Sequence, residues 1–209
     1  MKHLNPGACV RTAILLFATL FLSRCVAPYE SARMLPKGTS EVKAGYTQTR
    51  FYDGADAGKL DDGWGVGFGY GLTDRFNLKV RYERFYSDEG RGNYLGAGPK
   101  LAIIPNRIAA ALPFSLFFGE QSQTWAVSPM LLFTLPNASN TFEATFGARS
   151  DLFPEEENGL LFSFNLGFGW SKNLDQWSIR PDLGVVFGPD LDGADLCFGL
   201  GASYNFRWR

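Results

Sequence analysis

Large apolar side chains alternate with small or polar ones along most of the chain. Between Gly63 and Leu72, every second residue is bulky and apolar, and the residues between them are glycines. The stretch from Leu196 to Trp208 repeats the pattern, with glycine, serine, cysteine, asparagine and arginine at the alternate positions. A period of two is typical of β-strands, because successive side chains point to opposite faces. The chain is therefore expected to be all-β.

The face opposite the apolar one indicates which side of the strands meets solvent. It consists mainly of glycine and charge, which is too little bulk for the exterior of a soluble protein. A closed, antiparallel, up-and-down transmembrane β-barrel has the reverse arrangement, with its apolar face toward lipid and its polar face inside. We therefore expect such a barrel over residues 39–209.

The alternation predicts ten strands, most of them long enough to cross a bilayer when tilted. Their expected ranges are Thr39–Phe51, Gly63–Leu72, Phe76–Ser87, Tyr94–Ile104, Arg107–Phe118, Trp125–Leu135, Thr141–Ser150, Leu160–Trp170, Trp177–Phe187 and Leu196–Trp208. Four prolines fall inside these ranges: Pro99, Pro113, Pro129 and Pro181. Proline cannot donate to the hydrogen-bond ladder, so bulges or shifted strand boundaries are expected there.

The connections between the strands alternate in length. Short turns are expected near residues 73–75, 105–106, 136–140 and 171–176, and longer acidic loops at 53–62, 87–93, 119–124, 151–159 and 188–195. Outer-membrane barrels have short periplasmic turns and long external loops. An even number of strands then places both barrel termini in the periplasm.

The five tryptophans lie near expected strand ends and share parity with the apolar faces. Trp64 and Trp125 fall at the long-loop end, and Trp170, Trp177 and Trp208 at the short-turn end. Indole rings with an apolar body and a polar N–H are typical of the aromatic girdles at both membrane interfaces.

The N-terminus has the features of an export signal over residues 1–24, followed by a tether over residues 25–38. Positive charge at Lys2 and Arg11 precedes a short apolar core. The sequence Leu-Ser-Arg-Cys at residues 22–25 resembles a bacterial lipobox, which implies a lipid anchor at Cys25. The alternative is an ordinary signal cut nearby, because a small residue usually stands where Arg24 is. With Cys25 lipidated, Cys197 would be an inert, inward-facing thiol with no disulfide.

Together these features resemble the small, porin-like β-barrel proteins of the Gram-negative outer membrane, here with a lipoprotein signal. The resemblance covers residues 13–209 and includes the alternating aromatic terminus formed by Tyr204, Phe206 and Trp208. It implies contact with membrane lipid, with lipopolysaccharide and with the barrel-assembly machinery.

Catalytic chemistry finds little support in the sequence. The only histidine, His3, lies in the expected signal, which excludes histidine-based triads, general bases and metal ligands from the rest of the chain. We expect no enzyme activity and no cofactor. The net charge of −1 gives no argument for nucleic acid binding.

The long loops are acidic, and their carboxylates could bind divalent cations beside lipopolysaccharide phosphates. Asp190, Asp192 and Asp195 are weak metal candidates, since they lack the full spacing of a calcium loop. A solubilising outer rim is the simpler interpretation.

Parity places a set of charged residues on the inner face: Lys79, Arg81, Glu83, Lys100, Glu143, Arg149, Arg180, Asp182 and Arg207. They would form either a salt-bridged polar plug or the lining of a narrow, mildly anion-preferring pore. Ten strands enclose little more than side chains, which favours the plug.

Three functions therefore compete. The first is a non-catalytic barrel with a structural or surface-interaction role. The second is a narrow channel for small solutes. The third is a soluble, lipocalin-like carrier whose apolar face lines a ligand cavity.

Overall fold

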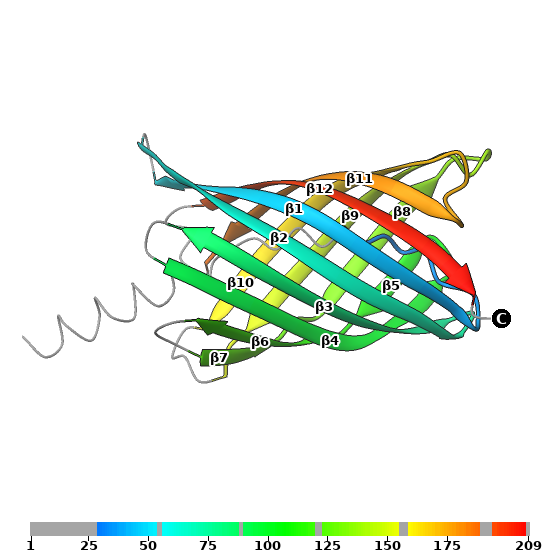
Figure 1. Cartoon of the computed structure of the whole chain (residues 1–209), viewed down its shortest axis with the longest axis horizontal. Helices are drawn as coiled ribbons and strands as arrows, with labels where there is room; N and C mark the ends of the chain where they lie inside the picture. The colour runs from blue at the N-terminus through cyan, green and yellow to red at the C-terminus, as the bar shows by residue number, and fades with distance from the viewer. Residues whose placement is uncertain are drawn as a thin grey trace, which may run out of the picture.

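The computed structural model describes residues 29–53, 56–87, 90–119, 123–154, 159–188 and 194–207. These residues form a closed antiparallel β-barrel, with neighbouring strands paired all the way round (Figure 1). None of the described residues belongs to a helix long and apolar enough to cross a bilayer.

The barrel contains twelve strand segments within the described residues. They are β1 (Thr39–Asp53), β2 (Asp56–Thr73), β3 (Phe76–Ser87), β4 (Gly90–Ile104), β5 (Ile108–Ala111), β6 (Phe114–Gly119), β7 (Gln123–Val127), β8 (Met130–Pro136), β9 (Phe142–Leu152), β10 (Leu160–Trp170), β11 (Trp177–Phe187) and β12 (Ala194–Arg207). The pairs β5–β6 and β7–β8 are each one spanning strand broken in the middle, because β4 pairs with both β5 and β6, and β9 with both β7 and β8. The prediction of ten spanning strands is confirmed.

The two breaks lie at two of the four prolines. Pro113 separates β5 from β6, and Pro129 separates β7 from β8. The carbonyl groups of both prolines still accept hydrogen bonds from the next strand, from Ser128 N at 2.9 Å and Ser150 N at 3.1 Å. Strand β4 continues through Pro99, and β11 continues through Pro181, so a proline does not by itself end a strand in this wall.

The first strand pairs with the last and closes the ring. The register of β1 against β12 runs from Thr39 opposite Arg207 to Tyr52 opposite Ala194. Both barrel termini therefore lie at one end, the end that also carries the short turns between β2 and β3, β8 and β9, and β10 and β11.

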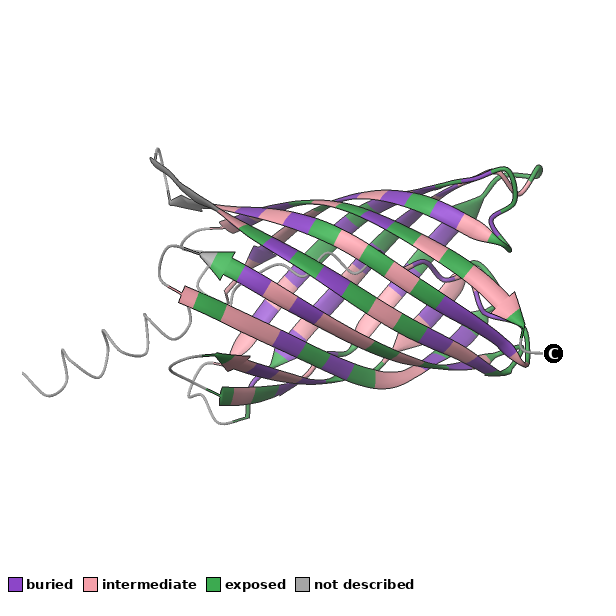
Figure 2. Ribbon diagram, in the orientation of Figure 1, coloured by how far each residue is buried: buried purple, intermediate pink, exposed green. Residues whose placement is uncertain are grey.

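Bulky apolar residues are exposed on every spanning strand. Exposed and buried positions alternate along much of the wall (Figure 2). Phe68, Phe164 and Phe198 are among the exposed large hydrophobics, whereas Arg180 is buried. The apolar band is thus on the outside, as the alternation predicts, and the fold class is confirmed. The lipocalin-like alternative requires the bulky apolar face of the strands to line a ligand cavity and is wrong, because that face points outward.

Two long loops are shorter than expected. A loop was expected over residues 87–93, but Ser87 at the end of β3 pairs with Gly90 at the start of β4. The acidic stretch from Asp53 to Asp62 was assigned to an external loop, but β2 begins at Asp56 and pairs with β1 out to Asp53. The β1–β2 hairpin therefore continues beyond the rest of the barrel at the long-loop end (Figure 1). Backbone pairing overrides the turn-forming composition of this stretch.

Candidate functional site

Residues 29–35 lie inside the barrel, against its inner wall, and residues 36–38 lead from there to β1 at the short-turn rim. We call residues 29–38 the plug. They fall within the segment that was expected to be a tether. Leu35 N donates to Asn77 Oδ1 at 3.0 Å, and Asn77 Nδ2 donates back to Leu35 O at 3.1 Å. Ala32 N donates to Thr134 Oγ1 at 2.7 Å. This part of the chain is a fixed component of the lumen and is not a free linker.

Glycines on the inner wall make room for the plug. A side chain at Gly45 or Gly201 would begin 2.4 Å and 2.7 Å, respectively, from carbon atoms of the Tyr29 ring. A side chain at Gly71 would begin 2.3 Å from the carbonyl oxygen of Pro36. Contacts this short do not occur, so these positions tolerate only glycine while the plug is in place. Part of the inward glycine face therefore receives the plug, whereas Gly63 and Gly65 make room for the side chains of Phe85 and Glu83 on β3.

Tyr29 is the innermost residue of the plug that the structure describes. Its hydroxyl donates to the carbonyl oxygen of Tyr46 at 2.5 Å, and its ring packs beneath the guanidinium of Arg81, whose Cζ lies 5.3 Å from the ring centroid. Such cation–π contacts are stronger away from water. Tyr29 is itself buried, so its contacts fix the plug deep within the lumen.

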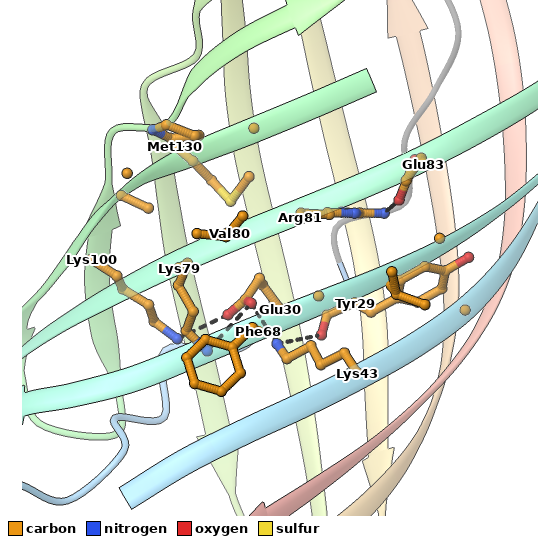
Figure 3. A pocket seen from close by; sticks show the side chains of 18 of the residues that line it. Tyr29, Glu30, Lys43, Phe68, Lys79, Val80, Arg81, Glu83, Lys100 and Met130 are labelled. Carbon is orange, nitrogen blue, oxygen red and sulfur yellow. Dashed lines mark hydrogen bonds and ion pairs between the residues drawn. The ribbon is translucent and has the colours of Figure 1, made fainter. Parts of the chain in front are cut away.

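A carboxylate of the plug meets three lysines of the wall (Figure 3). Glu30 forms ion pairs with Lys43, with Lys100 at 3.0 Å and with Lys79 at 3.6 Å. Glu41 on β1 contacts Lys79 and lies 3.3 Å from Lys43. We call these five residues the lysine cluster.

A second cluster ties the plug to the opposite side of the wall. Glu143 on β9 accepts hydrogen bonds from Arg180 on β11 at 2.5 Å and from Arg33 of the plug at 2.9 Å. Arg33 also reaches Asp175, in the turn before β11, at 2.7 Å. The side chain of Glu143 is completely buried, so both guanidinium groups neutralise a charge that has no access to water.

Most of the predicted inner charges lie in the lumen. Lys79, Lys100, Glu143 and Arg180 bind the plug or its partners as described above, and further pairs lie within the wall. Arg81 pairs with Glu83 on β3, Arg149 pairs with Asp151 on β9 at 2.6 Å, and Asp182 accepts from Asn165 at 3.3 Å.

Arg207 is the one predicted inner charge that does not lie in the lumen. It is exposed at the end of β12, where its Nε donates to Thr39 Oγ1 at 3.1 Å.

Sequence reasoning missed several members of these clusters. Glu30 and Arg33 precede the first strand in a stretch without a period, so nothing in the sequence places them inside. Glu41 and Lys43 have inward parity in the first strand, which is a signal that could have found them. Asp151 was assigned to an acidic external loop, but it is buried on β9 beside Arg149.

The predicted aromatic girdle and metal candidates lie partly in the described residues. Trp64, Trp125 and Trp170 are exposed on the outer face, and Trp177 is half-buried at the start of β11, while Trp208 lies outside the described residues. Of the weak metal candidates, Asp195 is buried on β12, and Asp190 and Asp192 lie outside the described residues.

Cys197 differs from its expected state. It is buried on the inner face of β12, as its parity predicts, but it is disulfide-bonded and not an inert thiol. The chain contains only two other cysteines, Cys9 and Cys25, both outside the described residues. The predicted lipid anchor at Cys25 also lies outside them.

Alkylation should detect this bond. We expect iodoacetamide to leave Cys197 unlabelled in the unfolded but unreduced protein, and to label it after treatment with dithiothreitol, with peptide mass spectrometry as the measurement. Labelling before reduction would contradict the bond. A sulfur atom in a disulfide cannot also carry a thioether-linked lipid, so the same peptide map separates a cross-linked Cys25 from a lipidated one.

Comparisons with known proteins support the fold. No protein-family model matches the chain, and no curated protein matches it in sequence. Among solved structures, an outer membrane channel from Pseudomonas putida F1 superposes with a TM-score of 0.52 at 12% identity, covering 88% of this chain and 100% of that one.

Two other solved structures superpose less closely. The N-terminal β-barrel domain of Pseudomonas aeruginosa OprF has a TM-score of 0.37 at 16% identity, covering 81% of this chain and 98% of that one. The attachment invasion locus protein Ail of Yersinia pestis has a TM-score of 0.37 at 14% identity, covering 81% and 99%. The fold shared with the Pseudomonas putida F1 channel is that of an outer-membrane β-barrel.

Proposed function

We propose that this protein is a closed, non-catalytic outer-membrane barrel with a structural or surface-interaction role. The observation that carries the proposal is the plug. Residues 29–35 of the plug occupy the lumen and are held there by two clusters of buried ion pairs, by hydrogen bonds from the plug backbone to wall side chains and by the contacts of Tyr29. A barrel filled in this way has its outer wall and its long-loop end available for contacts, and its lumen closed.

The position of the turns supports an orientation with both barrel termini in the periplasm. Short turns and both ends of the barrel lie on one side, and the extended β1–β2 hairpin lies on the other (Figure 1). Outer-membrane barrels place short turns in the periplasm and longer connections outside. In this orientation the β1–β2 hairpin would stand at the level of lipopolysaccharide, which is the partner we propose for it. The lack of histidine beyond His3 supports a role without catalysis.

Planar-bilayer recordings test the closed lumen. We expect the intact protein to give no steady openings, because the plug fills the cross-section. A variant in which residues 29–37 are replaced by a glycine–serine linker of equal length should give steady openings, since it keeps the wall but loses the ion pairs and the Tyr29 seat. The variant Asp175→Asn is the matched control, because it removes an exposed charge that pairs with Arg33 and leaves Glu143 and the lysine cluster in place. Steady conductance of the intact protein would contradict the proposal.

A gated channel for small solutes is the second candidate. The observation in its favour is that the plug forms no part of the wall, since all strand pairings that close the barrel are made without it. A segment that only fills the lumen can leave without breaking the ring. On this interpretation, the closed form seen here is the resting state of a channel.

A further inference from the structure

The three lysines of the lysine cluster belong to the barrel wall, but the carboxylate that all three contact, that of Glu30, belongs to the plug. We propose that Lys43, Lys79 and Lys100 are a binding site for a small carboxylate, which the plug occupies with its own Glu30. The inference deepens the channel candidate by naming the chemical class of its solute, although the site itself does not require conduction.

Lys100 shows most directly that the site is built for an incoming group. It lies on β4 and its side chain is only 2% exposed. Its ammonium donates to Glu30 Oε2 at 3.0 Å, to Ser31 O at 2.6 Å and to Arg33 O at 2.8 Å. All three acceptors belong to the plug. Without the plug, this cation loses all three of these acceptors.

The charge of the wall at this point also favours an anion. The three lysines come from β1, β3 and β4, and the wall contributes one carboxylate to them, that of Glu41, which contacts Lys43 and Lys79. Three positive charges against one negative charge leave the wall cationic where Glu30 now sits. The three lysines converge on both oxygens of one carboxylate, the arrangement that a free carboxylate would require.

The lysine cluster divides the space inside the barrel. A cavity of about 80 Å³ lies on its long-loop side, lined by residues that include Tyr94 and Glu83. A smaller space of about 10 Å³ lies on its short-turn side, lined by residues that include Leu174 and Asn205. All five residues of the lysine cluster line both spaces. Glu30 therefore sits at the partition, where a solute that passes through the lumen would meet the lysines.

Chemical rescue by acetate tests the site. The variant Glu30→Ala removes a group about the size of acetate and leaves the lysines in place. We expect sodium acetate, compared with sodium chloride at the same ionic strength, to raise the thermal midpoint of this variant in detergent in a saturable manner. Acetate at ten times its Kd should raise the ratio of folded to unfolded protein about tenfold. The intact protein, whose site is filled, should show no difference between the two salts.

Two further variants make the test specific. The double variant Glu30→Ala/Lys100→Met should lose the response to acetate, and Asp175→Ala, which removes an exposed carboxylate that also pairs with the plug, should show none. If Glu30→Ala does not fold alone, its folding yield in acetate and in chloride is measured by the heat-dependent band shift on gels, with rescue by acetate expected. Equal effects of acetate and chloride in both measurements would overturn the inference.

The outcome is independent of the proposed closed state. If the intact protein conducts and Glu30→Ala responds to acetate, the proposal of a closed lumen is refuted and the carboxylate site is supported. If the intact protein does not conduct and Glu30→Ala does not respond to acetate, the closed lumen is supported and the carboxylate site is refuted.

Discussion

Replacing Glu143 by alanine is expected to lower the free energy of unfolding by about 3–5 kcal/mol. Glu143 is completely buried, and its two carboxylate oxygens accept from Arg180 and Arg33. Removal of the carboxylate leaves two guanidinium groups facing each other in the lumen with no charge between them, and Arg33 then loses its buried attachment to the wall. The measurement is reversible urea unfolding in detergent micelles, followed by tryptophan fluorescence.

The same arginine provides the control. Arg33 also pairs with Asp175, whose side chain is 65% exposed. Exposed ion pairs contribute little, so Asp175→Asn should cost less than about 1 kcal/mol. The variant Glu143→Gln, which keeps the shape and an acceptor oxygen, should fall between the two. Equal losses of unfolding free energy for Glu143→Ala and Asp175→Asn would mean that the burial of Glu143 does not determine how much its ion pairs stabilise the protein.

An arginine in the middle of the outer face should be the most damaging change on the lipid side. Leu166 lies near the centre of β10, it is 43% exposed, and its partners across the sheet are Phe146 and Leu183, which also point outward. We expect Leu166→Arg to lower the free energy of unfolding in lipid bilayers by about 2–4 kcal/mol, the cost of a cation at the depth of the hydrocarbon midplane.

Position along the strand supplies the matched control for this variant. Leu135 is 74% exposed but lies near the end of β8, next to the turn that leads to β9. Leu135→Arg should cost about 0–1 kcal/mol, because an arginine near the interface can extend into the polar headgroups. The contrast is expected in bilayers. Equal costs at both positions would show that the apolar band does not face hydrocarbon.

The wall of the barrel was predictable from the sequence because a period of two leaves a strong signal. Phe68, Phe164 and Phe198 share parity with their apolar neighbours, and all three point outward. Proline chemistry also predicted two irregularities, at Pro113 and Pro129, although the strands continue through Pro99 and Pro181. A strand can continue through a proline where no carbonyl group of the neighbouring strand depends on a hydrogen bond from the missing N–H.

The lumen was predictable only in part. Parity identified eight of the charged residues that lie there, but it could not identify their partners on the plug, because residues 29–38 have no period. The inward glycines predict only a lack of bulk, because their role depends on the ring of Tyr29, which packs against Gly45 and Gly201. Asp151 was placed wrongly because composition suggested a loop, while its ion pair with Arg149 holds it on β9.

The seat of Tyr29 has a consequence for the order of assembly. Gly45 and Gly201 face each other directly in the register of β1 and β12, and the ring of Tyr29 covers both. Half of this seat comes from each end of the chain, so it exists only once the first and last strands have met. Tyr29 can therefore reach its final position only after β1 and β12 have paired, so ring closure must come before closure of the lumen in a newly made molecule.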